Sequence, residues 1–232
     1  MTILYISLLL FLGYGVLIIY YWISWTSIPE FISRNERPLT RFSVIVPARN
    51  EEENIVHCMR SLCNQEYPSE LFEIIIVDDG STDKTWDLIS GFYHPEKEIC
   101  SLRLEDISEG KFSAYKKRAI FSGIGVSHND VIVTTDADCL HPPEWLKTLD
   151  AFYRATNAAL TVAPVTYSFR PSVLEMFQAL DFLILQGITG ASVFKNIHSM
   201  CNGANLAYEK NALKTYKASR ELIMLLRAMI CC

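Results

Sequence analysis

The chain has 232 residues, half of them hydrophobic, and a formal net charge of −5 at pH 7. This length suits one sizeable core and is short for two domains, and the acidic balance argues against general nucleic-acid binding. The seven cysteines form no C-x-x-C pair, which indicates scattered reduced thiols rather than disulfides or a zinc site.

The N-terminal segment is strongly apolar. Residues 1–29 contain no charged residue, and residues 3–25 are almost entirely hydrophobic. About 20 apolar residues suffice for a helix to cross a bilayer, so we expect one transmembrane helix over residues 1–27. A cleaved signal peptide is the alternative, but the run is too long and lacks a basic start. The aromatic residues at its end suit a membrane interface: Tyr20, Tyr21, Trp22 and Trp25.

Arg34, Arg37 and Arg41 follow this segment, and no lysine or arginine precedes it. The positive-inside rule then places the rest of the chain in the cytoplasm, behind a single pass through the cell membrane. Residues 28–40 are expected to form a linker, and residues 41–232 one folded domain.

Strand and helix patterns alternate after the linker. Strands are expected over residues 42–46, 72–77, 100–104, 131–135 and 160–165, and helices over 55–62, 82–93, 113–124, 142–153 and 174–185, with Thr82 or Asp83 capping the second helix. Such alternation predicts a mostly parallel α/β sheet flanked by helices. Ligands of open α/β sheets bind beyond the carboxyl ends of the strands.

Polar residues follow the first two strands at this edge. After the first, Pro47 ends the ladder, Arg49 can meet a phosphate, and Glu51 can accept a hydrogen bond from a base or ribose. After the second, Asp78 and Asp79 can accept from a base N–H or hold the loop. Ordinary solvated loops and a capped D-G turn are the alternatives.

Two further segments suit a diphosphate and its cation. Lys111, which follows a glycine, can contact a diphosphate, or it is simply exposed. Asp136 and Asp138 follow a buried strand, and alternate residues on an extended segment point the same way. Both carboxylates can therefore address one divalent cation that bridges phosphate oxygens, with the small Ala137 between them leaving the backbone open to the ligand.

A small polar loop follows the last apolar helix. It contains Asn202, Gly203 and Asn205 and suits a position beside a sugar, although a plain turn is the alternative. The five histidines show no metal-ligand spacing and are assigned no chemistry.

The ordered set V-P-A-R-N-E-E, I-V-D-D-G-S-T-D, G-K, T-D-A-D and N-G-A-N resembles the inverting family 2 glycosyltransferases of the GT-A fold, over about residues 42–208. The resemblance implies a Rossmann-like GT-A domain, a nucleotide-sugar donor with UDP the expected nucleotide, Mg²⁺ or Mn²⁺, and a glycan or lipid-linked acceptor hydroxyl. It implies donor contacts from Pro47, Arg49, Glu51, Asp78, Asp79, Lys111, Asp136 and Ala137, metal binding by Asp136 and Asp138, and a sugar and acceptor loop at Asn202, Gly203 and Asn205.

The family's general base lies in an E-D or D-D pair beyond the N-G-A-N loop, and this chain shows no such pair. Codons compatible with residues 221–232, read in another frame, give a G-D-D segment, so we hypothesise a frameshift from about residue 217. A natural helix over residues 222–230 is the alternative. The frameshift predicts weak or absent transfer, because a lost general base costs about 10²–10⁴ in rate.

Other functions fit less well. A non-catalytic membrane protein that binds nucleotide sugar, or a pseudogene product, stays open as the alternative function. A nucleotidyltransferase requires a glycine-rich basic loop after the first strand, and a Rossmann dehydrogenase requires G-x-G-x-x-G there. Residues 47–53 are acidic and contain no glycine, which argues against both.

Overall fold

The computed structural model describes residues 1–32, 37–104, 115–168, 172–197 and 203–211. The chain divides into two compact units. One, here called the helical unit, comprises residues 1–31 and 164–201; the other, the sheet unit, comprises residues 32–163 and 202–232. Each is described by itself.

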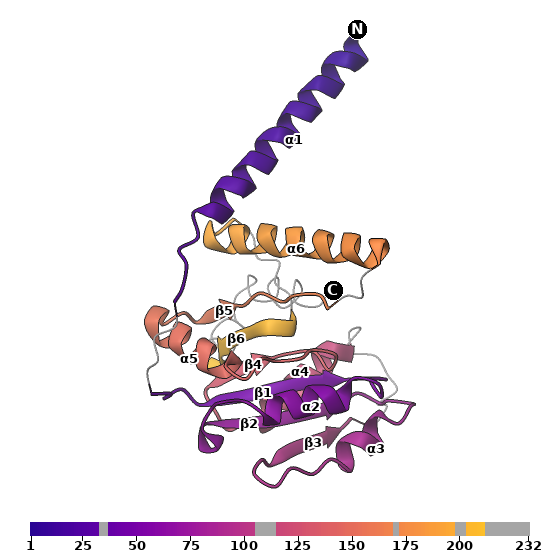
Figure 1. Cartoon of the computed structure of the whole chain (residues 1–232), viewed down its shortest axis with the longest axis vertical. Helices are drawn as coiled ribbons and strands as arrows, with labels where there is room; N and C mark the ends of the chain where they lie inside the picture. The colour runs from indigo at the N-terminus through magenta and orange to yellow at the C-terminus, as the bar shows by residue number, and fades with distance from the viewer. Residues whose placement is uncertain (33–36, 105–114, 169–171, 198–202, 212–232) are drawn as a thin grey trace. The chain divides into compact units, whose positions relative to one another are not determined.

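The sheet unit contains a six-stranded sheet in the order β3-β2-β1-β4-β6-β5 (Figure 1). The strands are β1 (Phe42–Ala48), β2 (Phe72–Asp78), β3 (Ile99–Arg103), β4 (Val131–Thr134), β5 (Leu160–Val162) and β6 (Leu206–Glu209). The first four strands in this order are parallel, and β6 runs antiparallel to both β4 and β5. The predicted mostly parallel sheet is confirmed, and β6 is an addition to it.

Helices cover the sheet on both faces. The faces follow from the alternation of side chains along a strand: Val44, Val46 and Ile76 belong to the main core together with residues of α2, α3 and α5, whereas Ile45 faces α4, where it lies against Gly123. The helices are α2 (Ile55–Cys63), α3 (Thr85–Ser90), α4 (Tyr115–Val126) and α5 (Trp145–Thr156), with 3-10 turns η1 (Ser69–Leu71) and η2 (Gly203–Asn205).

The central strands end at different levels. β1 and β2 pair to their ends, with Ala48 opposite Asp78, but β4 ends at Thr134, opposite Ile45. Pro47 also lacks a backbone N–H with which to extend a ladder. The last residues of β1 are therefore uncovered on the β4 side, which leaves a recess at the carboxyl edge of the sheet.

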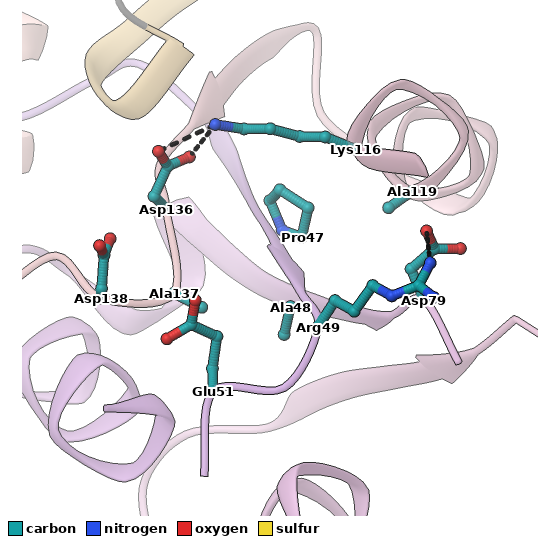
Figure 2. A pocket seen from close by; sticks show the side chains of 10 residues that line it. All are labelled: Pro47, Ala48, Arg49, Glu51, Asp79, Lys116, Ala119, Asp136, Ala137 and Asp138. Atoms are coloured by element: carbon teal, nitrogen blue, oxygen red, sulfur yellow. Dashed lines mark hydrogen bonds and ion pairs between the residues drawn. The ribbon is translucent and has the colours of Figure 1, made fainter. Parts of the chain in front are cut away.

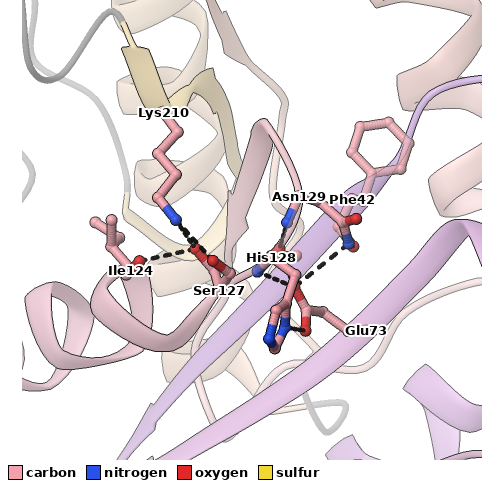
Figure 3. Close-up of polar contacts among 8 residues, drawn as sticks. Phe42, Glu73, Ile124, Ser127, His128, Asn129 and Lys210 are labelled. Carbon is pink, nitrogen blue, oxygen red and sulfur yellow. Dashed lines mark hydrogen bonds and ion pairs between the residues drawn. The ribbon is translucent and has the colours of Figure 1, made fainter.

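At the opposite edge, Glu73 connects the beginnings of the strands (Figure 3). Its carboxylate accepts from Ser43 Oγ at 2.5 Å and from the backbone N–H of His128 at 2.7 Å. Burial opposes its charge, but these bonds outweigh burial and lower the pKa of Glu73. Lys210 Nζ donates to the carbonyl of Ser127 at 2.7 Å, so the end of α4 is held in place on this side.

The helical unit contains two long helices, α1 (Thr2–Thr26) and α6 (Val173–Phe194). Both are long and apolar enough to cross a membrane. The N-terminal helix occupies the predicted residues, but α6 is longer than the predicted 174–185 and belongs to the same unit as α1 rather than to the sheet unit. The expectation of one domain over 41–232 did not include this division.

Candidate active site

A pocket of about 260 Å³ lies at the carboxyl edge of the sheet (Figure 2). The ends of β1, β2 and β4 form its walls, and α4 contributes a further side. Ten residues line it: Pro47, Ala48, Arg49, Glu51, Asp79, Lys116, Ala119, Asp136, Ala137 and Asp138. Seven of these were predicted as donor or metal residues, from segments that are up to 91 residues apart (47 to 138) in the sequence.

The loops after β1 and β2 lock into each other. Asn50 adopts a left-handed conformation with φ 55°, as does Gly80 with φ 69°. This turn lets Asn50 accept from the N–H of Thr82 at 2.9 Å while its own N–H donates to Ser81 Oγ at 3.0 Å. The interlocked loops hold Arg49 at the pocket.

Glu51 is fixed through its backbone. Its N–H donates to Thr85 Oγ1 at 2.7 Å, and its carbonyl accepts from the N–H of Ile55 at 2.9 Å, which begins α2. One carboxylate oxygen accepts from Asn54 Nδ2 at 3.0 Å. The carboxylate therefore lies at the pocket on a rigid support (Figure 2).

Asp79 is buried and is held by a cation from α4. Arg118 Nε donates to Asp79 Oδ1 at 3.0 Å, and Arg118 Nη2 contacts the same oxygen. Arg49 Nη1 lies 3.9 Å from Oδ2, and this second oxygen accepts no hydrogen bond from the described part of the chain. Buried acceptors are normally satisfied, so Oδ2 is suited to an N–H donor of a ligand.

Asp78, the neighbouring carboxylate, does not line the pocket. It is fully buried, accepts from the N–H of Ser81 at 3.3 Å, and lies 3.6 Å from Arg103 Nε. Its side chain therefore supports the loop after β2. This fits the loop-holding role that the sequence offered for one of the two aspartates, and the predicted donor contact of Asp78 stays a prediction.

Asp136 faces Lys116, which reaches across the pocket from α4 (Figure 2). Lys116 Nζ lies 2.7 Å from Asp136 Oδ1 and 2.9 Å from Oδ2. The expected extended geometry of the D-A-D segment is wrong, because β4 ends at Thr134 and the N–H of Cys139 donates to the Asp136 carbonyl at 3.2 Å. This turn nevertheless leaves Asp136 and the exposed Asp138 on the same pocket.

A neutral histidine supports this turn. His141 contacts Thr135 Oγ1 at 2.8 Å and Ser61 Oγ at 3.1 Å through its two ring nitrogens, and its ring lies 4.2 Å from that of Trp145. Burial lowers the pKa of His141 to about 4. The imidazole is therefore uncharged at neutral pH, and its hydrogen bonds connect Thr135, which precedes Asp136, to Ser61 of α2.

Part of the predicted sugar and acceptor loop lies away from the pocket. Asn205 Oδ1 accepts from Trp145 Nε1 at 3.0 Å, and the Gly203 carbonyl accepts from Thr134 Oγ1 at 3.0 Å. Neither residue lines the pocket. Asn202 and Lys111 lie outside the described residues, so their predicted roles are untested.

Sequence reasoning missed Lys116, Arg118, Ala48 and Ala119. The sequence signal for the two cations is the run of Lys116, Lys117 and Arg118 within the expected helix over residues 113–124, which makes one face of this helix basic. Spacing along a helix did not show that two of its basic residues reach two different strand ends.

Asp136 and Asp138 suit a divalent cation that takes only some of its ligands from the protein. The described residues contain no group of three or more metal-ligating side chains. Mg²⁺ is commonly held by one or two carboxylates together with phosphate oxygens and water. Asp136 and Asp138 supply two such carboxylates, and the ammonium group of Lys116 already occupies a cation position on Asp136.

This sheet topology, with carboxylates and cations gathered at the carboxyl edge, defines an α/β protein of the GT-A class. The chain belongs to glycosyl transferase family 2, whose family model matches residues 43–217.

The curated relatives match about half of this chain. The chain is 28% identical over 127 residues to glycosyltransferase AglE of Haloferax volcanii, which is 55% of this chain and 40% of that protein. It is 35% identical over 108 residues to an undecaprenyl-phosphate 4-deoxy-4-formamido-L-arabinose transferase of Photorhabdus laumondii, which is 46% of this chain and 31% of that one. The chain thus spans less than half of these curated relatives.

The fold is also that of a solved structure. The mannosyltransferase PcManGT of Pyrobaculum calidifontis, in complex with GDP-Man and Mn²⁺, superposes with a TM-score of 0.65 at 24% identity. The match covers 87% of this chain and 54% of PcManGT. The GT-A fold predicted from the ordered motifs is confirmed.

Proposed function

We propose that this protein binds a nucleotide-sugar donor and transfers its sugar, with inversion, to a hydroxyl acceptor. The observation that carries the proposal is the convergence of Arg49, Asp79, Lys116, Asp136 and Asp138 on one pocket. A nucleoside diphosphate needs an acceptor for its base and cations for its phosphates, and the pocket offers both. Membership of glycosyl transferase family 2 supports this assignment.

The side chains divide between the two ends of such a donor. The Asp79 oxygen that accepts no hydrogen bond from the described residues is the acceptor for a base N–H, a donor that both uracil and guanine carry. Arg49 and Lys116 lie where cations can contact the diphosphate. Asp136 and Asp138 hold Mg²⁺ or Mn²⁺, which when bound neutralises the charge that develops on the leaving nucleoside diphosphate. The Mn²⁺ complex of PcManGT supports a divalent cation, and UDP remains the expected nucleotide.

The membrane assignment rests on α1. Its 25 residues carry no charge and are long enough to span the bilayer. The arginines after it favour a cytoplasmic position for the sheet unit by the positive-inside rule. A lipid-linked acceptor is consistent with this location and with the undecaprenyl-phosphate named for one relative.

Binding and turnover test the proposal separately. The full chain in detergent is titrated with UDP-sugars and GDP-sugars, with and without Mn²⁺, and released nucleoside diphosphate is then assayed with glycan and lipid-phosphate acceptors. We expect Mn²⁺-dependent donor binding that weakens about tenfold or more in Asp136→Asn, because charge-assisted contacts contribute about 1.5–3 kcal/mol. Asp130→Asn, an exposed aspartate after α4, is the matched control.

Each result has one meaning. Donor binding with release of nucleoside diphosphate supports transfer. Donor binding without release on any acceptor favours the non-catalytic alternative. Equal donor affinity of Asp136→Asn, Asp130→Asn and the unaltered chain would refute the proposed site.

A further inference from the structure

One straight row of side chains runs the length of α6. Residues spaced alternately four and three apart lie on one face of a helix. The first four members of this row are large and apolar and between 53% and 88% exposed. The row consists of Val173, Phe177, Leu180, Ile184, Gly187 and Ala191.

The last part of the same row contacts α1. A Cβ on Gly187 would lie 3.9 Å from the ring of Trp25, and one on the adjacent Gly190 would lie 2.9 Å from it. Ala191 is completely buried. Trp25 is next to the last residue of α1, so α6 meets α1 at its end (Figure 1).

The opposite face of α6 carries most of the polar side chains of this helix. Glu175, Gln178, Gln186 and Thr189 lie on that face, with the apolar Phe182 between Gln178 and Gln186. Ser172 caps the helix by accepting from the N–H of Glu175 at 3.2 Å, so the polar face begins at the first turn. This division of faces distinguishes α6 from α1, which has apolar side chains all round.

These observations fix where a bilayer would meet α6. A helix with one apolar and one polar face lies in the membrane interface, whereas a spanning helix is apolar on every side. The bilayer that surrounds α1 adjoins α6 on the side where α1 contacts it, and this is the side that exposes Phe177, Leu180 and Ile184. The end of α1 is also rich in aromatic residues typical of the headgroup level.

We propose that α6 does not span the membrane but lies flat in its interface, with the row from Val173 to Ile184 inserted among lipid acyl chains. The occupant of this exposed apolar face is therefore the bilayer itself. The inference rests on the proposed insertion of α1 and goes beyond it, because length and apolarity alone are equally consistent with a second span.

Site-specific photo-crosslinking tests the inference in the full chain. Benzoylphenylalanine replaces Leu180, Ile184 or Gln178 in α6, or Leu9 in α1, and the protein is reconstituted in vesicles of phosphatidylethanolamine and phosphatidylglycerol. Lipid adducts are quantified by mass spectrometry. We expect adducts at Leu9, Leu180 and Ile184 that are several-fold more abundant than at Gln178, whose side chain is also exposed.

The positions separate the possible failures. Equal adducts at Gln178 and Leu180 would mean that lipid surrounds α6, and would overturn the interfacial placement in favour of a span. Adducts at Leu9 but at neither Leu180 nor Ile184 would overturn it while leaving the α1 anchor intact. No adducts at Leu9 would overturn the anchor and the inference together.

Discussion

At the scale of single residues, Asp79 is the most constrained charge of the pocket. It is 2% exposed, and its carboxylate accepts hydrogen bonds from the positively charged guanidinium group of Arg118. Removing one partner of a buried ion pair typically costs about 3–5 kcal/mol, because it leaves an uncompensated charge. We expect Arg118→Met to lower the free energy of unfolding by this order, as measured by denaturant titration in detergent.

A double-mutant cycle separates the pair from the packing of its side chains. Asp79→Asn removes the charge that Arg118 compensates, so the double variant should be more stable than Arg118→Met alone. If the effects of the two substitutions simply add, the two residues do not stabilise each other and this account of the pair is incorrect.

Lys116 competes with a metal ion for the same carboxylate. Its ammonium group lies within 2.9 Å of both oxygens of Asp136. Lys116→Met should therefore tighten Mn²⁺ binding in the absence of nucleotide, and weaken nucleotide-sugar binding in its presence, both measured by titration calorimetry. Lys117→Met, the neighbouring lysine that does not line the pocket, serves as control and should change neither affinity.

His141 should make stability depend on pH. Its folded pKa of about 4 lies below the value of 6.5 expected for the unfolded chain. Below pH 6.5 the unfolded state therefore binds a proton that the folded state does not, and stability falls until about pH 4. Relative to His141→Asn, the unaltered chain should lose on the order of 2–3 kcal/mol over this window. If the free energy of unfolding depended on pH in the same way in both proteins between pH 6.5 and 4, this prediction would be contradicted.

The sequence predicted the carboxylates of the site better than the cations. Asp79 directly follows β2, and Asp136 and Asp138 lie within four residues of the end of β4, so the end of a strand largely fixes where each one lies. The partners on α4 depend on the rotation of a helix and on side chains several bonds long. Neither is encoded in local spacing, and Lys116 was accordingly missed.

At the scale of elements, α4 packs unusually close to β1. A Cβ at Gly123 would lie 2.7 Å from Cγ2 of Ile45, which is fully buried. Gly123→Ala should therefore push α4 away from the sheet and destabilise the fold by about 1–3 kcal/mol. Because α4 carries Lys116 and Arg118, donor affinity should fall as well.

Gly125 provides a matched control on the same helix. A Cβ there meets no atom within 4 Å, so Gly125→Ala should stabilise the helix by about 0.5–1 kcal/mol. Unfolding measurements on both variants compare the same chemical change at two positions. Similar effects at the two glycines would show that helix propensity, and not the approach to Ile45, governs both.

Strand prediction succeeded where the strands are buried on both faces. The observed β1 and β2 extend the expected ranges only slightly, because continuous β-branched runs are typical of central parallel strands. β6 was missed, since four residues after a loop carry little pattern. The helix expected over 82–93 is shorter, beginning at Thr85, although Asp83 still accepts from the N–H of Thr85 at 3.0 Å.

At the scale of the whole molecule, the apolar residues divide between the buried core of the sheet unit and the exposed apolar helices α1 and α6 of the helical unit. The expected domain over 41–232 included residues 174–185 as one of its helices. Helical apolar spacing is the same whether the partner is a sheet or lipid. The structure places residues 164–201 in the same unit as α1, where α6 exposes its apolar row and lies against Trp25.

The sheet should lose its outer strand when β6 is disturbed. Ala207 pairs with Val133 of β4 and with Thr161 of β5, and proline cannot donate to such a ladder. Ala207→Pro should make the amides of β5 exchange rapidly in deuterated water while those of β1 and β2 stay protected. Ala207→Ser keeps the backbone donor and should retain protection. Slow exchange of β5 in the proline variant would contradict this role of β6.

The placement of β6 also bears on the order of events during translation. β5 emerges from the ribosome before α6, but the strand that joins it to β4 follows α6 in the chain. Domains tend to fold as their segments are synthesised, and β5 must wait for more than forty further residues (163 to 206) before its partner exists. With α6 in the membrane interface as proposed, its delivery to lipid would precede completion of the sheet.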